Sequence, residues 1–154
     1  EKSPCYNVRL KMSDTSMGTI YPDGYFINTG SPHFVIRCNN TDDLDLVSEG
    51  RKYRYDSRFA PGGANVNFCQ ETTNGLKVRT YERGVEAETL SCGTGVTASA
   101  LTMAFIRRRE SGVEKIVTTG GELNVSYKSD GSGNFSDIWL EGAACEVFQG
   151  VIVL

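Results

Sequence analysis

The residues with the clearest capacity for chemistry lie in the segment ETLSCGTGVTASA, where Cys92 precedes a Gly-Thr-Gly turn and a predicted helix from Thr94 to Arg109. The first N–H groups of a helix have no intrahelical acceptor, and together with the helix dipole they favour negative charge. Such a position lowers a thiol pKa from about 8.5 towards about 3.5–7.5, so Cys92 is a candidate thiolate. Gly93 and Gly95 let a carboxylate or phosphate approach the backbone. The alternative is an inert cysteine that packs in the core.

Four other polar residues could share a site with Cys92. Glu82 and Arg83 end a predicted strand, and the loop from there to Cys92 is short enough to bring both side chains back over the turn. His33 is the only histidine and follows a Gly-Ser-Pro turn, where an imidazole can face a cleft. Asn65 begins a strand after Pro-Gly-Gly. Taken singly, each has an ordinary alternative, namely a surface ion pair, a packed loop histidine and a turn-forming asparagine.

The elements that must position these residues follow from hydrophobic periodicity. Residues that alternate with polar neighbours predict half-buried strands, and capping and acidic residues at Asn40 to Asp43 predict a helix start. The strands are expected at 6–12, 25–28, 33–38, 65–70 and 76–82, a first helix at 42–55, and further strands after the second helix, with a hairpin turn at 130–133. The helix at 94–109 is apolar on nearly every face, which predicts that protein surrounds it. Arg107 to Arg109 are expected in its last turn, and Ser111-Gly112 can end it.

Together these elements predict one α+β domain over 1–154, in which mostly antiparallel strands curl as a sheet or barrel around one central buried helix, with a second helix outside. The formal net charge is −3 and both signs are scattered along the chain, which argues against a nucleic-acid surface or a polybasic membrane anchor. The sequence contains no run of about 18 apolar residues. We therefore expect a soluble, cytoplasmic protein.

Five cysteines are present, an odd number, far apart and with no C-x-x-C pattern. This distribution predicts reduced thiols rather than a disulfide framework or a zinc site, so no metal is expected. Four of them, Cys5, Cys38, Cys69 and Cys145, lie in apolar runs and are expected to be small buried residues in strands. The first methionine is Met12, which suggests a chain trimmed at its N-terminus.

Four blocks of sequence resemble one known family in the same order. They are DGYFINTGSPHFV, EGRKYRYDSRFAPGGANVNFCQ, YERGVEAETLSCGTGVTASA, and the closing GGELNV and IWLEGAACEVFQG. The chain resembles the C-terminal half of diaminopimelate epimerase over nearly its whole length. The resemblance implies an isomerase built from two similar halves, with the active site in the cleft between them and the N-terminal half absent here. It also implies interconversion of LL- and meso-diaminopimelate in lysine and peptidoglycan synthesis, with neither pyridoxal phosphate nor a metal as cofactor.

The resemblance also implies roles for individual residues. The family uses two cysteines on opposite faces of the substrate α-carbon, one as thiolate base and one as thiol acid, and Cys92 matches the cysteine of the second half. Glu82 matches the carboxylate paired with it, and His33 the imidazole associated with the cysteine of the other half. The implied substrate-binding residues are Ser31, Asn65, Glu82, Arg83, Gly93 and Thr94, of which Arg83 matches a ligand of the distal carboxylate and Gly93 and Thr94 the amides that hold the α-carboxylate.

Two departures from the family pattern affect the expected site. Ser31 stands where the family usually has asparagine before Pro-His, so an amide donor is replaced by a hydroxyl. The loop that contains Val85 to Glu88 looks one residue longer than the common pattern. The resemblance implies that the partner cysteine lies in a glycine-rich turn of the absent half, and no other cysteine here sits in such a turn. The chain alone is therefore predicted to fold but not to epimerise, and the full-length protein is expected to be a homodimer.

Three other functions remain open on the sequence. A related cofactor-independent racemase, such as proline racemase or a phenazine-type isomerase, would share the fold and differ in substrate. A cysteine hydrolase would use Cys92 activated by His33 and would form a covalent acyl-enzyme. A non-catalytic module would bind a dicarboxylate at the helix start without exchanging its protons.

Overall fold

The computed structural model describes residues 4–153, which form a ten-stranded sheet with two α-helices. The strands are β1 Cys5–Lys11, β2 Thr15–Tyr21, β3 Gly24–Asn28, β4 Pro32–Arg37, β5 Asn65–Thr72, β6 Gly75–Glu82, β7 Ala87–Thr89, β8 Ser111–Thr118, β9 Gly121–Ser129 and β10 Asn134–Cys145. The helices are α1 Leu46–Arg54 and α2 Gly93–Ile106, with a short 3₁₀ turn at Ser57–Phe59. Among the described residues, no helix is long and apolar enough to span a membrane.

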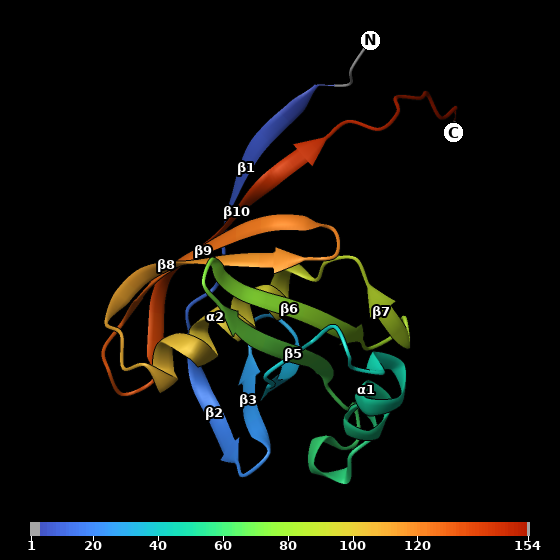
Figure 1. Ribbon diagram of the computed structural model, residues 1–154. Helices are drawn as coiled ribbons and strands as arrows, with labels where there is room; N and C mark the ends of the chain where they lie inside the picture. The colour runs from blue at the N-terminus through green and yellow to red at the C-terminus, as the bar shows by residue number, and fades with distance from the viewer. Residues whose placement is uncertain (1–3, 154) are drawn as a thin grey trace.

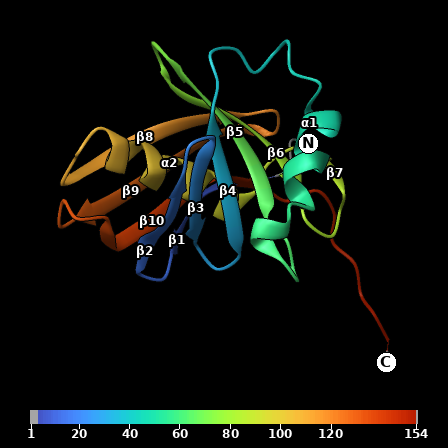
Figure 2. The same cartoon turned by 90° about the horizontal axis from the view of Figure 1, so that it is seen from below.

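The sheet closes on itself as a barrel. Neighbouring strands run in the order β10, β2, β3, β4, β5, β6, β8 and β9, and β9 pairs back to β10 to complete the ring. The β4–β5 and β6–β8 pairs are parallel and the other pairs are antiparallel. Helix α2 lies inside the ring of strands, whereas α1 lies outside it, beside β5 and β6 (Figures 1 and 2). The α+β class, the mostly antiparallel curled sheet and the buried central helix are thus confirmed.

The central position of α2 follows from its composition. Every residue from Gly95 to Ala104 is buried, and most of them are small, so the surrounding strands can approach the helix from all sides. Leu101 and Met103 are the largest of the wholly buried side chains on the helix, and they join the main core cluster with Ile116 and Val125 from β8 and β9. This cluster fixes the position of the helix and therefore the position of its N-terminus.

Helix α1 begins later than predicted. Its N-cap is Asp45, whose carboxylate accepts a hydrogen bond from the Ser48 N–H, and the helix starts at Leu46 rather than near Asp42. The Asn40 side chain instead accepts from the Asp42 N–H and holds the preceding residues in a turn. Asparagine and aspartate favour such local bonds outside helices, which explains the difference.

Helix α2 also ends earlier than predicted, at Ile106 instead of Arg109. Arg108 has a positive φ of 53°, and Ser111 is already the first residue of β8. Arg107 and Arg109 both donate to the carboxylate of Glu114, which is buried in β8. A buried carboxylate requires partners, so the arginines serve this ion pair rather than the last turn of the helix.

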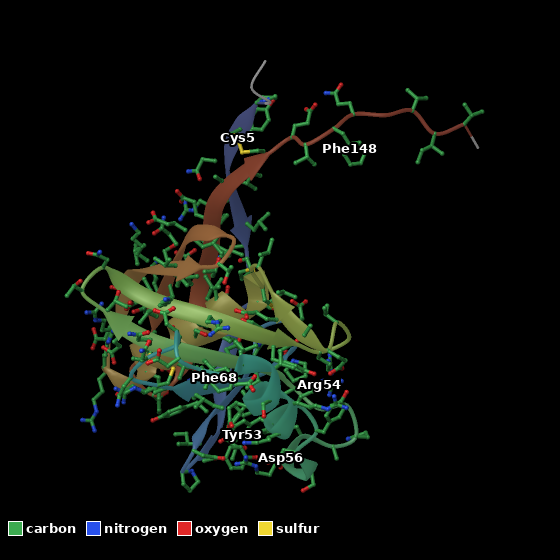
Figure 3. The ribbon with its side chains drawn as sticks, turned by 45° about the vertical axis from the view of Figure 1, so that its right-hand side comes forward. Cys5, Tyr53, Arg54, Asp56, Phe68 and Phe148 are labelled. Carbon is green, nitrogen blue, oxygen red and sulfur yellow. A yellow bond between two sulfur atoms is a disulfide. The ribbon has the colours of Figure 1, made fainter. Side chains whose placement is uncertain are left out.

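The prediction that all cysteines are reduced is wrong for two of them. Cys5 on β1 lies directly opposite Cys145 on β10, and the two form a disulfide near the end of an exposed two-stranded ribbon that extends from the barrel (Figures 1 and 3). Cys5 and Cys145 are therefore not buried small residues as expected, because nothing in the described chain covers this part of the ribbon. Cys69 is buried and free as expected, and Cys38 is free and half-buried.

The remaining strands agree with the sequence pattern to different degrees. The hairpin at 130–133 is confirmed between β9 and β10, where the Asp130 carboxylate accepts from the Ser132 and Asn134 N–H groups. Strand β2 was not predicted, and its sequence TSMGTIY alternates only weakly. Gly18 in β2 is needed there because a Cβ would lie 2.7 Å from the Phe26 carbonyl oxygen. Strand β1 was predicted to be half-buried, but all seven of its residues are exposed.

Candidate functional site

Cys92 is the N-cap residue of α2. Its backbone is extended, and its carbonyl accepts the first helical hydrogen bond, from the Val96 N–H. The side chain is 8% exposed, and its Sγ lies 3.6 Å from the Thr94 hydroxyl oxygen. The sulfur therefore lies at the N-terminal end of the central helix, as predicted, within reach of one hydroxyl group.

The pKa of Cys92 moves in the opposite direction from the one expected of a helix start. Burial raises the pKa of the Cys92 thiol, whereas the Thr94 hydroxyl and the Gly95 and Thr94 N–H groups act to lower it. The negative charge of Glu82 adds to the increase. Burial exceeds the effect of the helix N-terminus, so Cys92 is a protonated thiol at neutral pH in this structure.

His33 and Cys92 both contact the hydroxyl of Thr94. Its side chain is fully buried on β4, and its Nε2 lies 2.9 Å from both the Ser31 hydroxyl and the Thr94 hydroxyl. Burial lowers the pKa of His33 to about 3, and the positive charge of Arg83 acts in the same direction. His33 is therefore a neutral imidazole at physiological pH, joined to Cys92 by way of the Thr94 hydroxyl.

Asn65 connects this group to Arg83. The parallel pairing of β4 and β5 places Asn65 opposite His33, and its Nδ2 donates to the Ser31 hydroxyl at 3.2 Å and to the Pro32 carbonyl at 3.0 Å. Its Oδ1 accepts from the Arg83 N–H at 2.8 Å. The Asn65 amide thus fixes the turn before His33 and the start of the loop after β6 relative to each other.

Glu82 and Arg83 flank the group of hydroxyls and imidazole. Glu82 ends β6 and pairs with Ala87 in β7, so the loop folds back towards α2 as predicted. One carboxylate oxygen of Glu82 accepts from the Thr89 hydroxyl at 2.8 Å. The Arg83 side chain lines an open cleft of about 380 Å³ together with Asn28, Pro32, Arg58 and Phe59. Within residues 4–153 neither Glu82 nor Arg83 forms an ion pair, so the simple surface-pair alternative does not describe them.

Two buried polar residues behind His33 were not predicted. The Asn67 Nδ2 lies 2.9 Å from His33 Nδ1, and its Oδ1 accepts from the Thr80 hydroxyl at 2.9 Å. Gly95 makes room for the amide, because a Cβ there would lie 2.4 Å from Asn67 Oδ1. The available signal was an asparagine at an inward-facing position of the apolar strand NVNFC, since a buried polar group needs a partner.

The structure thus brings Ser31, His33, Asn65, Thr94 and Cys92 together at the N-terminal end of α2, with Glu82, Arg83 and Gly93 beside them. Within the part of the chain that the structure describes, no three His, Cys, Asp or Glu side chains are arranged to hold a metal ion. The arrangement offers a thiol, a neutral imidazole, helix-start N–H groups and a guanidinium. Such a set can move one proton and bind an anion.

Comparison with known proteins gives the same family along most of the chain. The family model described as "Diaminopimelate epimerase" matches residues 25–139. Diaminopimelate epimerase of Flavobacterium psychrophilum is 40% identical over 146 residues, which cover 94% of this chain and 57% of that protein. The enzyme of a Hydrogenobaculum species is 41% identical over 150 residues, which cover 95% of this chain and 50% of that protein. The chain therefore spans about half the length of these relatives.

Solved structures show the same fold at low sequence identity. A probable proline racemase from Agrobacterium radiobacter superposes with a TM-score of 0.68 at 17% identity, over 96% of this chain and 54% of that one. A hydroxyproline epimerase from Agrobacterium vitis gives 0.63 at 14% identity, over 91% and 51%. These two likenesses concern the fold alone. The family match and the 40% identity show that this chain belongs to the diaminopimelate epimerase family.

Proposed function

We propose that the protein to which this chain belongs interconverts LL- and meso-diaminopimelate in lysine and peptidoglycan synthesis, with neither pyridoxal phosphate nor a metal. The observation that supports this most directly is the position of Cys92, which caps the central helix in a chain about 40% identical to named diaminopimelate epimerases. In this proposal the described residues form one half of the site. A second half of the same polypeptide supplies the other cysteine.

The proposed chemistry follows from the acidity of the substrate. The α-hydrogen of an amino acid is a weak acid, so its removal needs a base at contact distance and fixed positive dipoles where charge develops. Inversion also needs a proton donor on the opposite face of the α-carbon, and Cys92 supplies one of these two groups. In this proposal Cys92 acts as the thiol acid for one direction of the reaction and as the thiolate base for the other.

The binding of the substrate is assigned to groups around Cys92. The N–H groups of Gly93 and Thr94 point out of the N-terminus of α2 and suit the α-carboxylate, since helix N-termini bind anions. Arg83 in the cleft suits the distal carboxylate, which a guanidinium can bind with two hydrogen bonds. Asn65 and Ser31 hold the turn beside them and present the remaining polar atoms.

Two consequences concern the whole protein. The isolated chain contains one cysteine of the proposed pair, so it should fold and bind substrate weakly but not epimerise it. We also propose that the complete protein acts in the cytoplasm as a homodimer, as the family resemblance implies. In that setting, closure of the two halves would exclude water and strengthen the electrostatic interactions in the site.

The decisive experiment follows the α-hydrogen directly. The full-length protein and its Cys92→Ala variant are incubated with LL-diaminopimelate in D₂O, and NMR records the loss of the α-hydrogen signal and the appearance of the meso isomer. We expect exchange with inversion in the parent and neither in the variant. Proline and hydroxyproline serve as control substrates. Absence of exchange with diaminopimelate but exchange with proline would replace the proposed substrate with a cyclic imino acid.

A further inference from the structure

Asn67 and Thr80 lie on the Nδ1 side of the His33 ring. Asn67 is on β5 and is fully buried, and Thr80 is on the neighbouring strand β6 and is 3% exposed. Their side chains bond to each other and to the imidazole through Thr80 Oγ1 to Asn67 Oδ1 and Asn67 Nδ2 to His33 Nδ1, each at 2.9 Å. Buried polar side chains that lack hydrogen-bond partners destabilise a fold. The position of this asparagine and threonine in the core therefore calls for an explanation.

The donors and acceptors of this group determine where the imidazole proton sits. The Asn67 Nδ2 carries two hydrogens and has no lone pair available, so His33 Nδ1 must accept. A neutral imidazole has one N–H, which therefore lies on Nε2. Nε2 faces the hydroxyls of Ser31 and Thr94, both at 2.9 Å, and can donate to them.

The hydroxyls of Ser31 and Thr94 contact His33 Nε2, and the Thr94 hydroxyl also contacts the sulfur of Cys92. The Ser31 oxygen accepts from Asn65 Nδ2, and either hydroxyl of the Ser31–Thr94 contact at 3.2 Å could donate. Once His33 Nε2 is a donor, the Thr94 oxygen is the one acceptor within hydrogen-bond distance of Ser31 among the described residues, so we assign the Ser31 hydrogen to it. The Thr94 oxygen accepts from His33 and from Ser31, which occupies both of its lone pairs. The hydrogen of the Thr94 hydroxyl is then left to donate to Cys92 Sγ, 3.6 Å away.

We propose that Asn67 and Thr80 are positioning residues that hold His33 as its Nε2–H tautomer and thereby direct the Thr94 hydroxyl hydrogen onto the sulfur of Cys92. The hydrogen bonds of Thr80, Asn67, His33, Thr94 and Cys92, which we call the His33 relay, all point towards Cys92. When Cys92 is ionised, its thiolate accepts a hydrogen bond from the Thr94 hydroxyl. The catalytic value of the relay rests on the function proposed above, whereas its direction does not.

The amide of Asn67 is the group that sets the direction. An ionised carboxylate at the same position could only accept, so it would take a hydrogen from Nδ1 and leave Nε2 as an acceptor. Thr94 would then donate to His33 rather than to Cys92. Gly95 allows the amide to lie this close to α2, since a Cβ would collide with Asn67 Oδ1.

The tautomer can be measured without any substrate. His33 is the only histidine, so histidine labelled with ¹⁵N gives one imidazole whose two nitrogens are assigned by their couplings to the ring carbon-bound hydrogens. At neutral pH we expect Nε2 at a protonated chemical shift and Nδ1 at an unprotonated one. An Nδ1–H tautomer or an imidazolium in the unmodified chain would overturn the proposal, and this measurement requires no variant to fold.

A matched pair of variants tests the role of the amide. Asn67→Asp should move the hydrogen to Nδ1 or give a doubly protonated ring, whereas Asn124→Asp, at an exposed position of β9, should leave the Nε2–H tautomer unchanged. Amide spectra verify that both variants are folded. An unchanged Nε2–H tautomer in folded Asn67→Asp would show that the amide does not set the direction.

The last readout separates this proposal from the proposed function. In the full-length protein, Thr80→Val and Asn67→Asp should slow deuterium exchange and shift the pH dependence of kcat, with little change in KM. If the full-length protein shows no exchange at all but the chain shows the Nε2–H tautomer, the proposed function fails and the relay stands. If Asn67→Asp reverses the tautomer yet leaves kcat and its pH profile unchanged, the relay has no effect on Cys92.

Discussion

Two ends of the molecule contain cysteines, and the environments of these cysteines are opposite. At the N-terminal end of α2, Cys92 lies inside the barrel wall with hydroxyls, an imidazole and helix N–H groups around it. At the end of the β1–β10 ribbon, Cys5 and Cys145 are exposed and bonded to each other. The labelled Phe148 lies on the C-terminal segment beyond the ribbon, away from the barrel (Figure 3).

Alternation of apolar and polar residues predicts which side chains share a face of a strand. It does not predict whether another element covers that face. The β5 strand alternates and is covered by α2 on one side and α1 on the other, so its first five residues are buried. The β1 strand alternates equally well, yet Tyr6 and Leu10 are each more than half exposed. Cys92 is therefore shielded from water, as chemistry that depends on desolvation requires, whereas the two cysteines of the ribbon are exposed to it.

The largest expected effect separates the two kinds of cysteine. In the full-length protein, Cys92→Ala should reduce the epimerisation rate by at least about 10²-fold, the range that a single acid or base contributes. The double substitution of Cys5 and Cys145 by serine should leave the rate unchanged, because the disulfide lies at the far end of the ribbon. Rates are measured by deuterium exchange. Equal losses in both proteins would mean that the ribbon belongs to the site.

The second effect concerns stability. Leu101→Ala removes a fully buried side chain from the core around α2 and should lower the free energy of unfolding by about 2–5 kcal/mol. Val113→Ala, at a position of β8 that is 64% exposed, is the matched control and should change it by less than about 0.5 kcal/mol. Both are measured by urea unfolding of the chain. A small effect of Leu101→Ala would show that α2 is loosely packed in solution.

Much of the barrel was predictable because its signals are local. The apolar, small-residue composition of 94–106 predicts a surrounded helix, and the alternation at 65–70 and 76–82 predicts the strands that pack on it. The end of α2 was not predictable, since the partner of Arg107 is Glu114, whose burial depends on the closed sheet. The ribbon disulfide was missed for the same reason, because it depends on pairing between residues 140 positions apart.

The site was predictable in its residues but not in its connections. Cys92, His33 and Asn65 were identified as candidates from residue type and local pattern. Their roles in the reaction come from the family resemblance and remain predictions. Their contacts follow from the parallel register of β4 and β5, which places His33 opposite Asn65, and no local pattern specifies that register. Asn67 was missed because the pattern of a strand predicts its inward direction but not the histidine that it meets.

The third effect is a pH dependence caused by His33. Its pKa is about 3 in the folded chain and about 6.5 when unfolded, so between these values the unfolded state binds more protons and stability falls as pH falls. From pH 7 to pH 5 the loss should be about 2 kcal/mol, before the carboxyl groups begin to titrate. His33→Gln should flatten this part of the curve, which urea unfolding at each pH can check. A parallel slope in the variant would mean that His33 is accessible to protons in the folded state.

The smallest effect is expected at the ribbon. Tyr6→Ala and Phe148→Ala each remove a large side chain that is 59% and 84% exposed, respectively, so no core contact is lost and no cavity forms. The free energy of unfolding should change by less than about 0.5 kcal/mol in either case. A loss as large as that of Leu101→Ala would mean that the ribbon or the C-terminal segment folds against apolar surface in solution. The two ends would then differ in sequence but not in burial, and the assignment of chemistry to the α2 end alone would lose its physical basis.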